Sequence, residues 1–290
     1  MTEKIKALRL GMPLYGSWKS PEEWLKLLAA KGCNAAYCPV GVDASDAEIM
    51  EYAAAARQHD IVIAEVGAWV HNPLHPDSVV AEHGFAGLVK ALTLAEKIGA
   101  RCCVNVAGSC STRWDGPHAL NLTRETFDRI VAYLRRLMAE VNPIKTAYSL
   151  EMMPWMFPTT AQEMLDLVVA VNHPGFAVHV DLVNITVNPR LYYENAAMTR
   201  ECFRLLGGMV RSVHAKDILL AEDLTVHLSE VRAGLGGFDH AALLSSVMEH
   251  CPDAPVMLEH LPDEREYDLA AEHIRSVAKM LGIAMPGTEG

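Results

Sequence analysis

The sequence lacks the features that mark membrane, secreted and nucleic-acid-binding proteins. No apolar run reaches the roughly 18 residues that span a bilayer, and no secretory signal precedes the first apolar stretch. Positive charge is also scarce. The 25 Lys and Arg residues stand against 36 Asp and Glu residues, for a formal net charge of −11. This balance argues against nucleic acid or an anionic membrane as a partner, so we expect a cytoplasmic protein that acts on a small molecule.

Other absences restrict the fold and its cofactors. The seven cysteines include no C-x-x-C pair, and their odd number favours reduced thiols over a disulfide framework. The glycine run at 234–237 lacks the spacing of a phosphate-binding fingerprint. No solenoid repeat, linker or break in composition divides the chain. We therefore expect residues 1–290 to form a single domain.

Apolar runs alternate with amphipathic segments along the whole chain. Eight such strand–helix units predict a single (β/α)8 TIM barrel in the α/β class, and a doubly wound open sheet is the alternative. A long loop is expected over 218–237 and a frayed tail over 282–290. The expected strands are 5–14, 34–40, 61–69, 101–107, 146–152, 176–183, 210–217 and 254–261. The first expected helix begins at Ser20. The other expected helices cover 46–59, 84–98, 123–141, 160–171, 196–206, 238–250 and 263–280.

Four consecutive strands end on a residue that can bind a metal ion. These residues are Glu151, Asp181, His214 and Glu259. Asp181 follows Glu151 by 30 positions, His214 follows Asp181 by 33, and Glu259 follows His214 by 45. One strand–helix unit takes roughly 30 residues or more, so each candidate lies about one unit after the last. Because the C-terminal ends of barrel strands meet at one face, we expect the four side chains to surround one point.

Three carboxylates and an imidazole crowd together only when a cation holds them, because like charges repel strongly at short range. Such an oxygen-rich set suits one divalent metal ion. Mn²⁺ fits best, and Mg²⁺, Co²⁺ and Zn²⁺ are alternatives. Any single acid could instead cap a helix, and His214 alone could be a packed core histidine. A metal ion beside a carbonyl favours proton abstraction from the neighbouring carbon. Glu151 and Glu259 are the candidate catalytic pair, each both ligand and proton-transfer group.

Strand periodicity adds candidates for substrate binding. Lys216 shares a face with His214 and is expected to project into the barrel mouth, with an ion pair to Asp217 as the alternative. Trp69 and His71 share a face with Glu65 on the third strand, and Trp69 could equally be core. Arg232, just before the glycine run, could reach back over the mouth or lie on the surface.

The chain resembles the xylose isomerase-like TIM barrels, the superfamily of sugar isomerases and epimerases also described as AP-endonuclease-2-like. The resemblance rests on Leu150-Glu151-Met152, Val180-Asp181-Leu182, His214-Ala215-Lys216-Asp217, Gly234-Leu235-Gly236-Gly237-Phe238-Asp239 and Leu258-Glu259-His260. It implies a metal ion held by the four residues above, and an enediolate mechanism with Glu151 and Glu259 as the acid/base pair. Relatives often carry a histidine three residues after the aspartate, where this chain has Asn184. The amide keeps hydrogen bonding near the substrate but does not titrate.

We therefore expect a metal-dependent isomerase or epimerase of a ketose or keto-polyol, with a carbohydrate as its small-molecule partner. A keto-sugar or keto-inositol dehydratase or lyase is the alternative, because it uses the same ligands and expels a β-hydroxyl. A barrel that binds a small molecule without turnover is a third hypothesis. Such a barrel would be expected to have lost one of the four metal-binding residues, and the intact quartet argues against it. The missing histidine also counts against the DNA-repair endonucleases of the superfamily. Exposed apolar residues on the outer helices suit a homo-oligomer.

Overall fold

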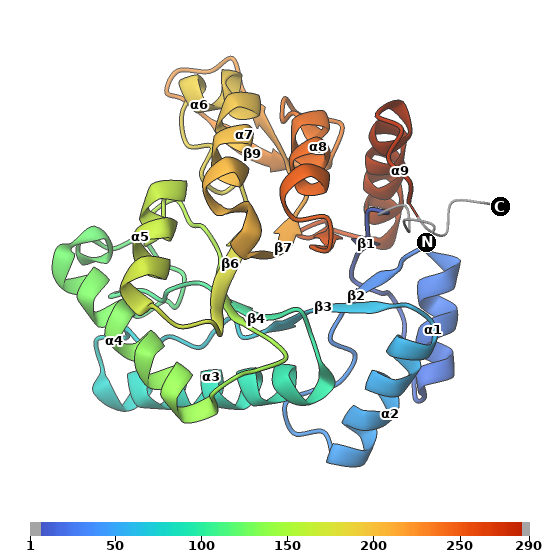
Figure 1. Cartoon of the computed structure of the whole chain (residues 1–290). Helices are drawn as coiled ribbons and strands as arrows, with labels where there is room; N and C mark the ends of the chain where they lie inside the picture. The colour runs from blue at the N-terminus through green and yellow to red at the C-terminus, as the bar shows by residue number, and fades with distance from the viewer. Residues whose placement is uncertain (1–6, 286–290) are drawn as a thin grey trace.

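The computed structural model describes residues 7–285. Eight parallel strands form one sheet that curves into a nearly closed barrel surrounded by helices (Figure 1). Around the barrel the order is β1, β10, β7, β6, β5, β4, β3 and β2. The bounds are β1 Leu10–Gly11, β2 Ala35–Tyr37, β3 Val62–Gly67, β4 Cys102–Asn105, β5 Tyr148–Leu150, β6 Phe176–Val180, β7 Val210–His214 and β10 Val256–Met257.

The first and last barrel strands are paired, which distinguishes this sheet from a doubly wound one. Leu10 of β1 lies in register with Val256 of β10. Between β1 and β2 there is no strand ladder, but the Asn34 N–H donates to Leu10 O at 3.2 Å, and the Leu10 N–H donates to Asn34 Oδ1 at 2.9 Å. The predicted (β/α)8 class is therefore confirmed.

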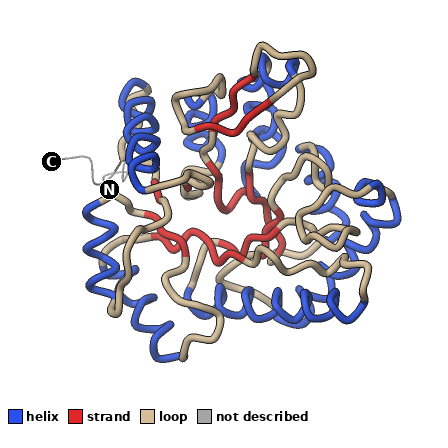
Figure 2. The backbone as a smooth tube through the Cα atoms, turned by 180° about the vertical axis from the view of Figure 1, so that it is seen from behind, coloured by secondary structure: helices blue, strands red, loops and turns tan. Residues whose placement is uncertain are grey.

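Helices cover the outside of the barrel, as the view from behind shows (Figure 2). Side-chain caps decide where several of them begin. Asp77 accepts hydrogen bonds from the Val79 and Val80 N–H groups, so α3 begins six residues before the predicted start at 84. Asn188 and Pro189 start the short α6, which the sequence did not predict. The bounds are α1 Pro21–Ala30, α2 Asp46–Gln58, α3 Ser78–Ile98, α4 Arg124–Val141, α5 Ala161–Val171, α6 Pro189–Tyr193, α7 Asn195–Leu206, α8 His240–His250 and α9 Glu264–Met280, with short 3₁₀ turns at Ala119–Leu122 and Gly207–Met209.

The core lies between the helices and the barrel wall. Leu88 and Leu92 of α3 and Ile130 and Leu134 of α4 are fully buried there. All seven cysteines are free, as expected. Within residues 7–285 no helix has the length and apolar character needed to cross a membrane.

The segment after β7 is the main departure from the predicted fold. Instead of a loop, β8 Asp217–Leu220 and β9 Leu228–Val231 form an antiparallel hairpin beside α6 and α7 (Figure 1). The Asp217 carboxylate holds the returning chain, because it accepts from the N–H groups of Gly234 at 2.9 Å, Gly236 at 3.0 Å and Phe238 at 2.9 Å. A Cβ on Gly236 would overlap the Ile218 carbonyl. The glycine run is therefore a tight turn around a carboxylate.

The chain ends differ from the prediction in part. The first strand covers Leu10–Gly11 rather than 5–14, and residues 5 and 6 lie outside the described residues. The expected frayed tail is packed at least through Met285, which is buried, and Ala284 O accepts a hydrogen bond from the Leu8 N–H at 2.8 Å. Residues 286–290 lie outside the described part.

Candidate metal centre

The four predicted ligands come from neighbouring strands of the barrel. Glu151 and Asp181 directly follow β5 and β6, His214 ends β7, and Glu259 lies just beyond β10. One ligand atom from each lies within 4.8 Å of the other three. His214 Nδ1 is 2.9 Å from Glu259 Oε1, 3.4 Å from Asp181 Oδ2 and 3.6 Å from Glu151 Oε1. The structure thus brings the predicted quartet together at the C-terminal face.

This cluster has the properties of a cation site. Asp181 Oδ2, His214 Nδ1 and Glu259 Oε1 are buried and have no hydrogen-bond partner among residues 7–285. Their close contacts are ion pairs with one another and with Lys216. Burial lowers the pKa of His214, but Glu259 and Glu65 outweigh it and raise that pKa well above its usual value. The carboxylates therefore strongly favour positive charge at this point. Carboxylate oxygens with one imidazole fit a divalent metal ion.

Lys216 supplies positive charge to the same carboxylates. Its Nζ lies 2.7 Å from Asp181 Oδ2 and 3.0 Å from Glu259 Oε1. Burial raises the pKa of Asp181, but Lys216 and His214 outweigh it and lower that pKa to about 2. Lys216 is only 3% exposed and does not line the cavity described below, because its Nζ is directed at the ligand carboxylates. The alternative ion pair with Asp217 does not form either, because the Asp217 oxygens accept from the glycine turn.

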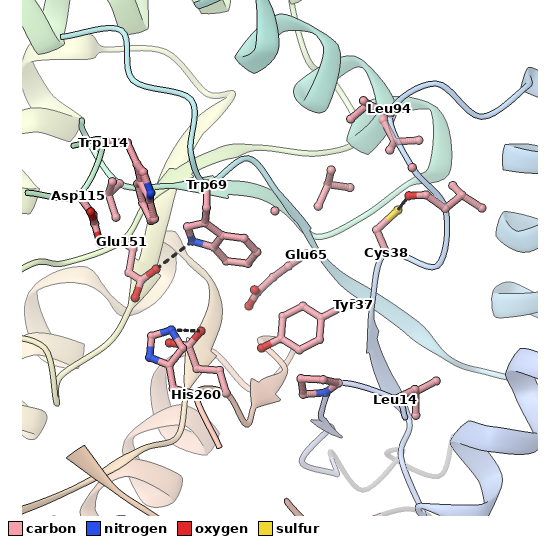
Figure 3. Close-up of a pocket in the computed structure, with 18 of the residues that line it drawn as sticks. Leu14, Tyr37, Cys38, Glu65, Trp69, Leu94, Trp114, Asp115, Glu151 and His260 are labelled. Atoms are coloured by element: carbon pink, nitrogen blue, oxygen red, sulfur yellow. Dashed lines mark hydrogen bonds and ion pairs between the residues drawn. The ribbon is translucent and has the colours of Figure 1, made fainter. Parts of the chain in front are cut away.

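Two predicted substrate-binding residues, Trp69 and Asn184, line the cavity described below and also hold Glu151. The Trp69 Nε1–H donates to Glu151 Oε2 at 3.3 Å, and the Asn184 amide donates to Glu151 Oε1 at 2.9 Å. Asn184 Oδ1 in turn accepts from Lys216 Nζ at 2.9 Å. The Trp69 ring lies over Gly67, where a Cβ would overlap it, and points toward Glu151 (Figure 3). Both oxygens of Glu151 are therefore oriented by the protein.

Glu259 has a more cationic environment than Glu151. Burial raises the pKa of Glu259, but His214 and Lys216 outweigh it, so the pKa lies well below its usual range. His260 Nε2 lies 3.6 Å from Glu259 Oε2, and His260 Nδ1 lies 3.3 Å from Glu230 Oε2 on β9. Sequence reasoning gives no sign of Glu230, because it places that residue in a loop rather than in a hairpin beside the site.

Beneath the quartet lies a fourth buried acid, Glu65 of β3. Its Oε2 is 3.4 Å from His214 Nε2, and its Oε1 is 3.7 Å from His179 Nδ1. The Ser212 hydroxyl donates to Glu65 Oε1. Metal-binding histidines usually donate their second ring N–H to such a carboxylate, which fixes the ring orientation. The strand pattern groups Glu65 with Trp69 and His71 on one face of the strand but cannot identify its partner on β7.

A cavity of about 810 Å³ opens beside the quartet. Glu151 and Glu259 line it, whereas Asp181 and His214 are not among its lining residues. The wall is largely apolar and aromatic (Figure 3). It consists of Pro13, Leu14, Trp18, Tyr37, Cys38, Val40, Gly41, Val42, Glu65, Val66, Gly67, Trp69, Leu94, Val106, Trp114, Asp115, Glu151, Met153, Asn184, Glu259, His260 and Tyr267.

Besides Lys216, two expected substrate-binding residues are not part of this wall. The His71 ring packs against Gly87 of α3, where a Cβ would overlap the imidazole, and His71 O accepts from the Asn105 amide at 3.0 Å. The Arg232 Nε–H donates to Glu266 Oε2 of α9 at 2.9 Å. Both side chains therefore serve contacts between elements outside the cavity.

The chain matches one protein family model, described as xylose isomerase-like TIM barrel, over residues 25–277. No curated protein sequence matches it. Among solved structures, it is similar to D-psicose 3-epimerase with D-tagatose from Clostridium cellulolyticum H10, at 15% identity and a TM-score of 0.67, covering 96% of this chain and 100% of that one.

Two further solved structures of the same fold have different activities. Endonuclease IV from Thermus thermophilus is 14% identical, with a TM-score of 0.71 over 94% of this chain and 99% of that chain. The 3-keto-D-glucoside 4-epimerase from E. coli is 13% identical, with a TM-score of 0.65 over 94% and 99%. At these identities the similarity shows a shared fold and does not identify the reaction, which has to be inferred from the residues of the site.

Proposed function

The chain belongs to the xylose isomerase-like TIM barrel family, and we propose that it is a divalent-metal-dependent isomerase or epimerase of a ketose or keto-polyol. The reaction would proceed by proton abstraction α to a carbonyl, through an enediolate. One observation carries the proposal. Of the four clustered ligands, only Glu151 and Glu259 also line the cavity. They are thus the two that can meet both a cation and a substrate.

The cation would be held by Glu151, Asp181, His214 and Glu259, with Mn²⁺ as the best fit and Mg²⁺, Co²⁺ and Zn²⁺ as alternatives. When bound, it would polarise the substrate carbonyl and so acidify the neighbouring C–H bond. Asp181 and His214 act as ligands alone, because they do not line the cavity. This division leaves proton transfer to the two glutamates.

Glu151 and Glu259 have surroundings that suit this role. Hydrogen bonds from Trp69 and Asn184 orient Glu151, and His214 and Lys216 lower the pKa of Glu259, so that Glu259 is ionised. The two residues come from strands that are separated by two others. A substrate carbon between them would lose its proton to the glutamate that is ionised and receive a proton from the other glutamate in its protonated form, which inverts that carbon.

His260 supports a second candidate, a keto-sugar or keto-inositol dehydratase. It lines the cavity next to Glu259. The hydrogen bond with Glu230 raises the pKa of His260 and outweighs burial, which lowers it. A protonated imidazole there could donate to a departing β-hydroxyl. The dehydratase uses the same carboxylates, so the two reactions differ in their products.

Deuterium uptake tests the proposal directly. Mn²⁺-loaded protein is incubated with ketoses, 3-keto-glycosides and keto-inositols in D₂O, and products are followed by NMR. We expect α-deuterium in at least one substrate, with loss of the exchange in Glu259→Gln and Glu151→Gln. Exposed Glu82 provides the control, because Glu82→Gln should exchange at the wild-type rate.

The same experiment separates the alternatives. Loss of water with a new ultraviolet-absorbing enone would assign the dehydratase instead. Duplex DNA with an abasic site is included because of the fold shared with endonuclease IV, and we expect no cleavage. Absence of exchange and of dehydration with every compound would refute the proposal.

A further inference from the structure

The cavity extends well beyond the candidate ligands. Its volume of about 810 Å³ lies near the upper end of the roughly 300–1,000 Å³ found for pockets that hold drug-sized ligands. A free monosaccharide is much smaller than such a ligand. In Figure 3 Glu151 and His260 lie at one side of the cavity, and Leu14, Cys38 and Leu94 lie at the other. A substrate whose reacting carbon is at the glutamates therefore has room for a second part.

The far side of the cavity is apolar. Val40 and Val42 follow β2, Leu14 follows β1, and Leu94 belongs to α3. Val42 is 41% exposed although it lies on this wall. Such a surface cannot satisfy sugar hydroxyls by hydrogen bonding, and it gains free energy when an apolar group covers it.

Aromatic rings connect the two sides. Trp69 is hydrogen-bonded to Glu151, and the Tyr37 hydroxyl donates to Leu258 O, next to Glu259, at 3.2 Å. Trp18 lies at the apolar side, because its Nε1–H donates to Pro39 O at 3.3 Å, next to Val40. Aromatic rings pack against the C–H face of a sugar ring as well as against another aromatic ring.

Charge on the wall argues against a phosphorylated substrate. Among the described residues that line the cavity there is no Arg or Lys, whereas Glu65, Asp115, Glu151 and Glu259 are acidic. The His260 imidazole also lies on this wall, but it is paired with Glu230 and Glu259. Lys216 lies close by but is paired with Asp181 and Glu259. Phosphate groups are usually bound by Arg or Lys forks or by free backbone N–H groups. Here the N–H groups of the glycine turn are taken by Asp217.

From these features we propose that the substrate is an uncharged keto-glycoside, a glycoside with a ketone on its sugar ring, that carries an apolar or aromatic aglycone, rather than a free or phosphorylated monosaccharide. The inference rests on the proposed function, since it places the reacting sugar ring at Glu151 and Glu259. The aglycone then lies along Trp18, Leu14 and Val42.

Binding measurements test this substrate class without requiring turnover. Isothermal titration of the Mn²⁺-loaded protein uses unreactive analogues that lack the ring ketone. It compares four forms of glucose, galactose and mannose: the free sugar, the methyl glycoside, the phenyl glycoside and the 6-phosphate. We expect the phenyl glycoside of at least one sugar to bind roughly ten- to a hundredfold tighter than its methyl glycoside. This is the gain in affinity expected when one aromatic ring is buried. We expect the 6-phosphates to bind more weakly than the free sugars.

A charge placed on the apolar wall provides the matched variant. Val42→Arg should reduce the phenyl-to-methyl affinity ratio to near one and change methyl glycoside affinity by less than about threefold, since the charge disrupts only the surface that the phenyl ring would cover. Val79 is 76% exposed on α3 outside the cavity, so Val79→Arg should keep the wild-type ratio. Circular dichroism verifies that both variants are folded.

Each contrary result overturns the inference. These results are tighter binding of any 6-phosphate than of its free sugar, equal affinities for phenyl and methyl glycosides in all three series, undetectable binding of every phenyl glycoside, and an unchanged ratio in Val42→Arg. Because the titrations measure binding alone, they are independent of the deuterium experiment. A failed exchange with a preserved phenyl preference would refute the proposed reaction and not the aglycone site.

Discussion

Glu65 offers the sharpest test of how the barrel interior supports the candidate metal centre. Its carboxylate is fully buried and faces His214 Nε2 at 3.4 Å. Glu65→Gln keeps the shape and removes the charge that orients and polarises the imidazole. Loss of such a partner typically lowers metal affinity roughly 10- to 100-fold. Because 3.4 Å is longer than the usual hydrogen bond of about 2.9–3.0 Å, we expect the lower end, about tenfold or about 1.4 kcal/mol.

The assay is Mn²⁺ binding to metal-free protein, measured by competition with a fluorescent chelator. Ser212→Ala should weaken binding less, because Ser212 acts on His214 only through Glu65. In the Glu65→Gln background the Ser212 change should add little, which a double-mutant cycle reveals as coupling. Exposed Glu82 provides the control through Glu82→Gln. Mn²⁺ affinity of a folded Glu65→Gln protein within about twofold of wild type would refute the orienting role.

Three further predictions concern stability, measured by urea unfolding. The pKa of Asp181 is lowered to about 2 from 3.8, so the ionised carboxylate should stabilise metal-free protein by about 2 kcal/mol above pH 4, and this stabilisation should be lost as the pH falls toward 2. Asp181→Asn should remove this part of the pH dependence of the free energy of unfolding. An unchanged pH profile in Asp181→Asn would contradict the prediction. Lys216→Met should destabilise metal-free protein by about 3–5 kcal/mol, and Mn²⁺ should restore part of the loss; equal losses with Mn²⁺ and with chelator would contradict the shared site. Gly236→Ala should cost about 1–3 kcal/mol, because its Cβ would overlap the Ile218 carbonyl, whereas Gly208→Ala has open space and should cost less; equal costs would exclude the tight turn.

The strand–helix order and the convergence of the four ligands could be predicted from the sequence. Both depend on local patterns, since an apolar run that ends at Glu151 or Asp181 shows its strand end directly. The barrel then brings consecutive strand ends to one face. Period-two alternation likewise grouped Glu65 and Trp69 on one face of the predicted third strand, although it did not identify their partners.

The tertiary structure alone decided which side chains meet. Glu65 and Ser212 are separated by 147 positions and Trp69 and Glu151 by 82, and no local pattern encodes pairs so distant. Lys216 turned inward because Asp181 and Glu259 compensate its burial, and Arg232 turned outward to Glu266. Residue type and strand period therefore determined which residues could bind a cation and at which positions in the chain they stand. Barrel closure determined which carboxylates also reach the cavity, because that depends on the packing of strands distant in sequence.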